Sequence, residues 1–205
     1  MKKLLSIFLT ILCTINLNAQ VWDVLEEWPD EILRNVKLAS TNSSASPTGN
    51  RILFLLNLAR TDGSLFKSTV LQRFIDSTSY DSNRDLISLM ADLEKVKNLP
   101  LLKYDSVLES VAQKHAVSMG KKGKTGHDGF TDRYKVAMQT STMVAENCFY
   151  GPEEPLIIVT ELLIDAGVPT LGHRKNILER AFSRIGIWVA PHKEYVNNCV
   201  MSFGN

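Results

Sequence analysis

The order of the predicted elements indicates an α+β fold in which helices cover an antiparallel sheet. Segments with apolar residues at helical spacing dominate residues 51–119, whereas residues 185–203 contain two strand-like runs that a short loop joins. The chain has 205 residues, 44% of them hydrophobic, which is enough for one domain with a substantial core. We do not expect two full domains.

The charge balance excludes two classes of protein. Lys and Arg number 23 against 22 Asp and Glu, and charged residues make up 22% of the chain. Neither a disordered chain nor a polybasic nucleic-acid-binding protein has this composition. We therefore expect no nucleic-acid partner.

The first 19 residues have the three parts of a secretory signal peptide. Lys2 and Lys3 precede an apolar run from Leu4 to Leu12, and Ala19 offers a small residue for cleavage. An uncleaved anchor is the alternative. Cleavage removes two of the 23 basic residues and leaves 21 against 22 acidic ones. No other apolar run is long enough to span a membrane, so we expect a secreted or periplasmic protein.

Two cysteines, Cys148 and Cys199, remain once Cys13 is removed with the signal peptide. Two thiols in an oxidising compartment favour one disulfide, which is our prediction. Two separate buried thiols are the alternative if the Cα atoms lie too far apart. Neither cysteine belongs to a C-x-x-C motif, and we expect neither to be a nucleophile.

Residues 20–49 are predicted to be an N-terminal extension and linker in front of a domain at 50–205. Val21, Val24, Leu25 and Trp28 have helical spacing until Pro29 interrupts it, which indicates a short docking segment. Residues 39–49 are small and polar, as linkers are.

Four helices are predicted in the first half of the domain, at residues 51–60, 65–75, 85–96 and 106–119. The first is apolar on nearly every side and should be buried. The fourth begins with a capping box, in which Ser106 and Glu109 would each bond a backbone N–H. His115 shares the apolar face of this helix, so we interpret it as a core histidine rather than a ligand.

The second half alternates between loops and short elements. We predict a strand at 144–149, an apolar helix at 156–164, a helical turn from residue 172, and a hairpin of strands 185–189 and 195–203 with a five-residue loop. His127 follows Gly126, where the chain cannot stay helical, and His173 enters the helical turn.

Five short motifs occur in order between residues 57 and 187. They are Asn57-Leu58-Ala59-Arg60, Gly126-His127-Asp128, Ala145-Glu146-Asn147, the run Gly-His-Arg-Lys-Asn-Ile-Leu from Gly172 to Leu178, and Ile185-Gly186-Ile187. In this order they resemble the CAP superfamily of cysteine-rich secretory, antigen-five and pathogenesis-related proteins. The SCP-like extracellular domain of its exported bacterial branch is the most similar, and the resemblance covers residue 50 to the end.

The resemblance implies a three-layer α-β-α sandwich with a central, mainly antiparallel sheet. It implies structural roles for five motif residues, Asn57, Arg60, Asn147, Arg174 and Asn176. Relative to compact members, the segment from Thr61 to Asn98 is an insertion, which we expect to reshape one edge of a surface cleft.

The resemblance also implies that two histidines and two acidic residues meet in that cleft. By motif position these are His127, Glu146 and His173, and Asp165 is the best candidate for the second acid. Imidazole and carboxylate groups suit zinc or another divalent cation. The carboxylates could ligate the metal, or they could bond the far ring nitrogens and orient the rings. A metal-free network of charge-assisted hydrogen bonds stays open as the alternative.

The cleft predicts a binding module for an unknown ligand, with lipids, sterols, glycans and peptides as candidates, in a protein that we expect to be a monomer. The alternative is a metal-assisted hydrolase, protease-like or esterase-like, acting on an extracytoplasmic substrate. Several members of the superfamily have a serine after the first histidine, where Asp128 stands here. Because nucleophile, base and oxyanion donors cannot all be assigned, we leave the catalytic residues unknown and favour binding.

Overall fold

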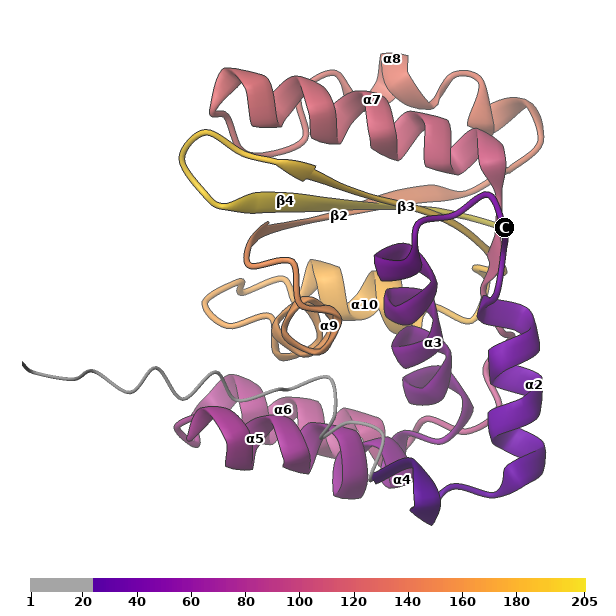
Figure 1. Ribbon diagram of the computed structural model, residues 1–205, viewed down its shortest axis with the longest axis vertical. Helices are drawn as coiled ribbons and strands as arrows, with labels where there is room; N and C mark the ends of the chain where they lie inside the picture. The colour runs from indigo at the N-terminus through magenta and orange to yellow at the C-terminus, as the bar shows by residue number, and fades with distance from the viewer. Residues whose placement is uncertain (1–23) are drawn as a thin grey trace, which may run out of the picture.

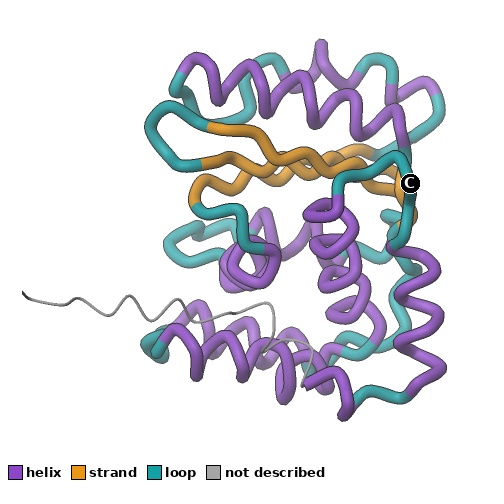
Figure 2. The backbone as a smooth tube through the Cα atoms, viewed as in Figure 1, coloured by secondary structure: helices purple, strands orange, loops and turns teal. Residues whose placement is uncertain are grey.

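Four strands form one sheet at the centre of the protein (Figures 1 and 2), in a computed structural model that describes residues 24–205. They are β1 (Lys103–Tyr104), β2 (Val144–Gly151), β3 (Arg184–Pro191) and β4 (Asn197–Gly204), in spatial order β1-β3-β4-β2. β4 pairs antiparallel with β2 and β3, and β1 pairs parallel with β3. The sheet is therefore mainly antiparallel, as predicted, and β2 is one of its edges. The predicted signal peptide, residues 1–19, lies outside the described residues.

Helices cover both faces of this sheet (Figure 1). One face carries α7 (Ser106–Lys122), followed by the short α8 (Phe130–Tyr134) and the 3-10 helix η3 (Ala137–Gln139). The other face carries α3 (Pro47–Thr61), α9 (Pro155–Ile164) and α10 (Gly172–Leu178). The predicted three-layer α-β-α sandwich is confirmed.

The predicted insertion adds helices beyond α9. It contains α4 (Gly63–Phe66), the π-helix η2 (Lys67–Leu71), α5 (Gln72–Thr78) and α6 (Arg84–Leu93), which lie below α9 in Figure 1. Phe66, Phe74 and Leu89 are buried and join the same hydrophobic core as α3 and α9. The insertion is therefore part of the packed domain.

The N-terminal extension also packs onto the domain. It forms η1 (Val24–Glu27) and α2 (Asp30–Ser40), and Trp28 donates a buried hydrogen bond from Nε1 to Thr69 Oγ1 at 3.1 Å. The segment with linker composition ends earlier than expected, because Ser46 caps α3 by accepting from the Gly49 N–H at 2.9 Å. Pro47 then takes the first helical position, where its missing N–H is not needed.

The N-terminus of α7 differs from the predicted capping box. Asp105 is the N-cap, and its Oδ1 accepts from the N–H groups of Val107 and Leu108, both at 2.9 Å. Glu109 instead accepts from the Tyr104 hydroxyl at 2.7 Å. The predicted cap at Ser106 was wrong by one residue, because aspartate caps a helix as well as serine does and stood next to it.

The predicted Cys148–Cys199 disulfide was wrong. β2 and β4 pair Cys148 with Val200 and Phe149 with Cys199, and neighbouring residues of a strand point to opposite faces of a sheet. Cys148 packs with Ala112 and Ala116 under α7, whereas Cys199 packs in the core on the other face. Both thiols are free and buried because their side chains point apart, even though their strands are neighbours.

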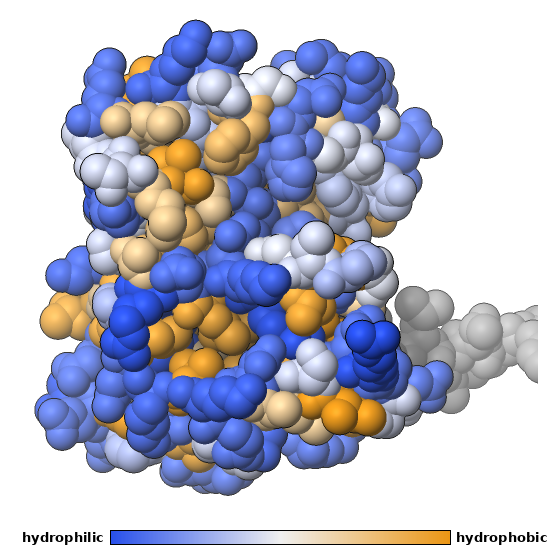
Figure 3. Space-filling model, turned by 180° about the vertical axis from the view of Figure 1, so that it is seen from behind, coloured by the Kyte–Doolittle hydropathy of each residue, from blue (hydrophilic) through white to orange (hydrophobic). Residues whose placement is uncertain are grey.

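The surface seen from behind has apolar areas broken up by hydrophilic side chains (Figure 3). Among residues 24–205, no helix combines the length and the apolar character that crossing a bilayer requires.

Candidate functional site

Each histidine of the predicted site bonds to a carboxylate. His127, in the loop after α7, places Nδ1 2.9 Å from Glu146 Oε1 of β2. His173, in the first turn of α10, places Nδ1 2.7 Å from Asp165 Oδ1 at the end of α9. The four residues therefore form two histidine–acid pairs, and the short arm of Asp165 reaches its histidine directly.

The Glu146 carboxylate is buried and has several donors. Arg133 of α8 bonds both carboxylate oxygens, with Nη2 2.9 Å from Oε1, and the Tyr134 hydroxyl lies 3.4 Å from Oε2. Burial alone would raise the pKa of Glu146, but the hydrogen bonds from His127 and Arg133 lower it to about 2. Glu146 is therefore an anion at neutral pH, and it fixes the His127 ring.

Arg133 is a site residue that the sequence did not reveal. It lies in a five-residue helix with no motif around it. The available signal was indirect, since a buried carboxylate such as Glu146 requires a cationic or hydrogen-bonding partner.

His115 lies beneath this pair as a core residue. Its Nε2 donates to the Gly126 carbonyl at 2.9 Å and is 3.7 Å from Glu146 Oε1. Burial lowers the pKa of His115 and favours the neutral ring. The interpretation of His115 as a satisfied core histidine is confirmed.

Asp165 orients His173 and also bonds backbone N–H groups in the first turn of α10. It ends α9 in the left-handed region at φ 57°, which Asp tolerates better than most residues. Its Oδ2 accepts from the backbone N–H groups of His173 at 2.9 Å and Arg174 at 3.2 Å. One carboxylate thus satisfies the first turn of α10 and holds the imidazole ring.

Arg174 anchors this turn to the insertion. Its buried guanidinium donates to the carbonyls of Leu163, Ile164 and Asp85, to the Ser88 hydroxyl and to Asp92 Oδ2. Asp85 also accepts from the Gly167 N–H at 3.0 Å. Helix α6 therefore braces the segment that carries His173.

Two asparagines link the Ala-Glu-Asn and Gly-His-Arg motifs. Asn147 donates to the His173 carbonyl at 3.0 Å, and Asn176 donates to Asn147 Oδ1 at 2.8 Å and to the Glu146 carbonyl at 3.5 Å. Because Glu146 and Asn147 are neighbours in a strand, their side chains leave β2 on opposite faces. The Glu146 pair lies on the α7 side and the Asp165 pair on the α9 side, and among residues 24–205 no hydrogen bond joins the pairs directly.

Both imidazole rings keep one nitrogen available. A carboxylate at Nδ1 fixes the direction of the ring and leaves Nε2 as the nitrogen for another partner, and metal-binding histidines are commonly held in this way. The side chains of His127 and His173 are 47% and 24% exposed, so solvent reaches both rings. This geometry favours the acids as orienting groups and the Nε2 atoms as ligands.

A second set of ligand-type atoms, from His115, Glu146 and Cys148, lies within 4.8 Å. The oxygens of Glu146 already bind Arg133 and His127, and Nε2 of His115 donates to a carbonyl. Burial raises the pKa of the Cys148 thiol, which keeps it protonated. The described contacts identify this set as a hydrogen-bonded core network.

An open groove runs beside β2 on the side of the second pair. It has a volume of about 420 Å³ and is lined by Asp165, His173, three consecutive residues of β2 and residues of α9. His127 is outside this lining.

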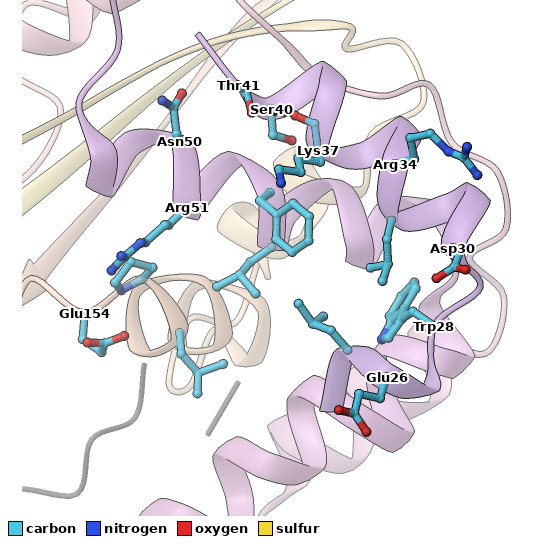
Figure 4. A pocket seen from close by; sticks show the side chains of 16 residues that line it. Glu26, Trp28, Asp30, Arg34, Lys37, Ser40, Thr41, Asn50, Arg51 and Glu154 are labelled. Carbon is cyan, nitrogen blue, oxygen red and sulfur yellow. Dashed lines mark hydrogen bonds between the residues drawn. The ribbon is translucent and has the colours of Figure 1, made fainter. Parts of the chain in front are cut away.

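A larger cavity, about 690 Å³, lies between α2, α3 and the start of α9 (Figure 4). Leu25, Trp28, Leu33, Phe54 and Leu156 give it apolar walls. Neither histidine of the site lines it, so it is separate from the histidine–acid pairs.

The lowered pKa of Glu146 predicts acid-sensitive stability. At neutral pH we expect Glu146→Gln to lower the free energy of unfolding by about 3 kcal/mol, the equivalent of the pKa shift. This difference should shrink as the pH falls from about 4.5 to about 2, because the wild-type carboxylate then becomes protonated. Urea unfolding at pH 7, 5, 4 and 3 measures it. Glu153→Gln, at an exposed position, is the control and should change stability little at any pH. A stability difference between Glu146→Gln and wild type that does not depend on pH would contradict the lowered pKa of Glu146.

The sequence of this chain matches one family of known proteins. Residues 53–203 match a family model described as CAP, the cysteine-rich secretory protein family. None of the curated proteins matches the chain.

Three solved structures are similar in part. An outer surface protein from Borrelia burgdorferi is 25% identical with a TM-score of 0.46, over 62% of this chain and 96% of that one. An extracellular protein containing an SCP domain from Bacillus anthracis is 16% identical with a TM-score of 0.46, over 80% and 45%. A cysteine-rich secretory protein from Staphylococcus aureus is 19% identical with a TM-score of 0.39, over 58% and 38%. The chain thus spans less than half of the last two.

Proposed function

This chain belongs to the cysteine-rich secretory protein (CAP) family, and on that premise we propose that it is an exported binding module. Its ligand would occupy the groove beside β2, and a divalent cation would be held at the outer edge of β2 by the two oriented histidines, one from each side of the sheet. The observation that carries the proposal is that both imidazoles use Nδ1 to bond a buried carboxylate, which leaves Nε2 available. The family and the signal-like residues 1–19 support export.

The residues fit a divalent cation such as zinc by the chemistry of their donors. His127 and His173 would hold the ion through Nε2, while Glu146 and Asp165 would bond Nδ1 and fix the direction of each ring. When bound, zinc supplies a Lewis acid that polarises carbonyl groups. The protein's own contribution is the fixed tautomer and direction of each ring.

Zinc titration by calorimetry tests this proposal. We expect wild-type protein to bind zinc and His127→Ala combined with His173→Ala to abolish binding. Asp165→Asn should weaken binding about 10- to 100-fold, because the His173 ring loses the carboxylate that orients it.

His192→Gln is the matched control for this titration. His192 lies in the β3–β4 loop with both ring nitrogens bonded, Nε2 to the Lys124 carbonyl and Nδ1 to backbone N–H groups, so its loss should leave zinc affinity unchanged. Undiminished zinc binding in the double histidine variant would refute the site.

A metal-assisted hydrolase is the alternative, and turnover separates it from binding. The two nearest hydroxyls before β2 have other partners, since Ser141 accepts from Arg184 and Thr142 accepts from Asn205. The hydrolase that we consider here would therefore use water as its nucleophile. Zinc-dependent cleavage of peptide or ester substrates that the double histidine variant loses would favour the hydrolase.

A further inference from the structure

The outer edge of β2 has backbone groups that point away from the sheet. The Met143 carbonyl accepts from the Asn205 N–H at 3.3 Å, which extends the β2–β4 register by one pair. In an antiparallel ladder, alternate residues bond to the same neighbour. Residues 143, 145, 147 and 149 therefore bond toward β4, whereas Glu146, Cys148 and Tyr150 present their N–H and C=O groups to the other side.

Two further contacts agree with this assignment. The Ser183 N–H donates to the Gly204 carbonyl at 3.1 Å, so Gly204 bonds away from β2 while Asn205 bonds toward it. Asn176 reaches the Glu146 carbonyl from the α10 side, where no strand lies. Among residues 24–205, no loop or turn bonds to the backbone of Cys148 or Tyr150.

The groove of about 420 Å³ follows this edge. It is lined by Cys148, Phe149 and Tyr150 in succession, although their side chains alternate between the two faces. A groove that touches all three must run along the backbone edge itself. β2 contains neither lysine nor proline, the residues that protect many exposed edge strands, and Glu146 is its one charged residue.

The wall opposite β2 indicates which side chains would fit. Ile157, Leu162 and Val168 give it apolar surface, and Glu161 lies among them. Glu161 is half-buried, no hydrogen bond or ion pair is assigned to its carboxylate among the described residues, and burial raises its pKa. A cationic group entering the groove would supply the missing partner.

We propose that the ligand of this groove is an extended peptide that pairs with the β2 edge and directs apolar and basic side chains toward α9. The proposal rests on the groove being the binding site proposed above, and it selects peptides from the ligand classes left open there. Main-chain hydrogen bonds to Cys148 and Tyr150 would give affinity, and alternate side chains would give specificity. His173 at the end of the groove would lie beside the docked chain.

Fluorescence anisotropy with labelled heptapeptides tests the pairing. The probe is acetyl-Thr-Val-Thr-Lys-Thr-Val-Thr-amide, with a set in which its second, fourth and sixth residues are varied. Two N-methylated forms of each binding peptide carry the methyl groups on alternate residues, odd or even. We expect one form to lose at least 10-fold in affinity and the other to bind like the parent, because only one set of amides faces β2.

Protein variants give an independent readout. Tyr150→Pro removes the outward N–H, which an edge strand tolerates, and Tyr150→Ala removes the same ring but keeps the N–H. We expect Tyr150→Pro to bind about 3- to 10-fold more weakly than Tyr150→Ala, and Glu161→Gln to lose the preference for lysine. Circular dichroism verifies folding, and if Tyr150→Pro does not fold, the methylated pair decides alone.

Zinc titration of the same samples separates this inference from the metal proposal. Peptide pairing is overturned if zinc binds but no peptide does, or if both methylated forms bind equally. Peptide binding with the expected methylation pattern supports it even where zinc binding fails.

Discussion

Replacing Gly186 with alanine is expected to destabilise the protein by about 3 kcal/mol or more, the upper range for overpacking. A Cβ at this position of β3 would lie 1.9 Å from the Glu109 nitrogen and 2.2 Å from the Leu108 carbonyl carbon. Both atoms belong to the backbone of α7, so neither can turn away as a flexible side chain would. The helix must instead lift off the sheet and lose its packing on that face.

Urea unfolding measures the effect, with Gly172→Ala as the matched control. Gly172 lies in α10, and a Cβ there would meet only Thr170 Oγ1 at 3.5 Å, which is ordinary contact. We expect the control to stay within about 0.5 kcal/mol of wild type. A Gly186→Ala protein as stable as the control would show that α7 does not pack on β3 in this way.

Arg60→Met is expected to cost about 3–5 kcal/mol, because each buried carbonyl left without a donor costs about 1–3 kcal/mol. Arg60 is fully buried in α3 and donates five hydrogen bonds to four carbonyls, those of Pro100, Ile177, Glu179 and Phe182. Burial lowers the pKa of Arg60 to about 10, so the guanidinium remains charged at neutral pH. Methionine has similar length but leaves these carbonyls without donors.

Two substitutions calibrate this effect in chemical denaturation. Arg60→Lys keeps the charge but has one nitrogen in place of three, so an intermediate loss is expected. Arg34→Met changes an exposed arginine of α2 and should stay within about 0.5 kcal/mol of wild type. Equal effects of Arg60→Met and Arg34→Met would contradict the central role of Arg60.

Periodicity and motif order were sufficient for the architecture. An apolar run with polar residues at its end identified the buried helix around Leu55 and Leu56, and strand-like runs identified the final hairpin, because local patterns determine both. The motifs selected His127, Glu146 and His173, and the family resemblance supplied Asp165 as the candidate for the second acid. Their pairing follows from contacts between motifs, such as the hydrogen bond from Asn147 to the His173 carbonyl.

The register between strands distant in the chain could not be predicted from the sequence. The direction of Cys148 relative to Cys199 depends on how β2 and β4 align, and no local pattern determines that alignment. The Arg133–Glu146 ion pair likewise joins a short helix to a strand. The cap at Asp105 was missed for another reason, since two adjacent residues were both good caps.

The Arg174 contacts limit which helices can be deleted from a shortened form of this protein. Removing α6 would take away Asp92, Ser88 and the Asp85 carbonyl, and a cation with 2% exposure would lose its counter-charge. A minimal version must therefore retain that helix or exchange the arginine for an apolar side chain. Helix α6 therefore supports the turn that carries His173, the site histidine that lies farther from it in sequence.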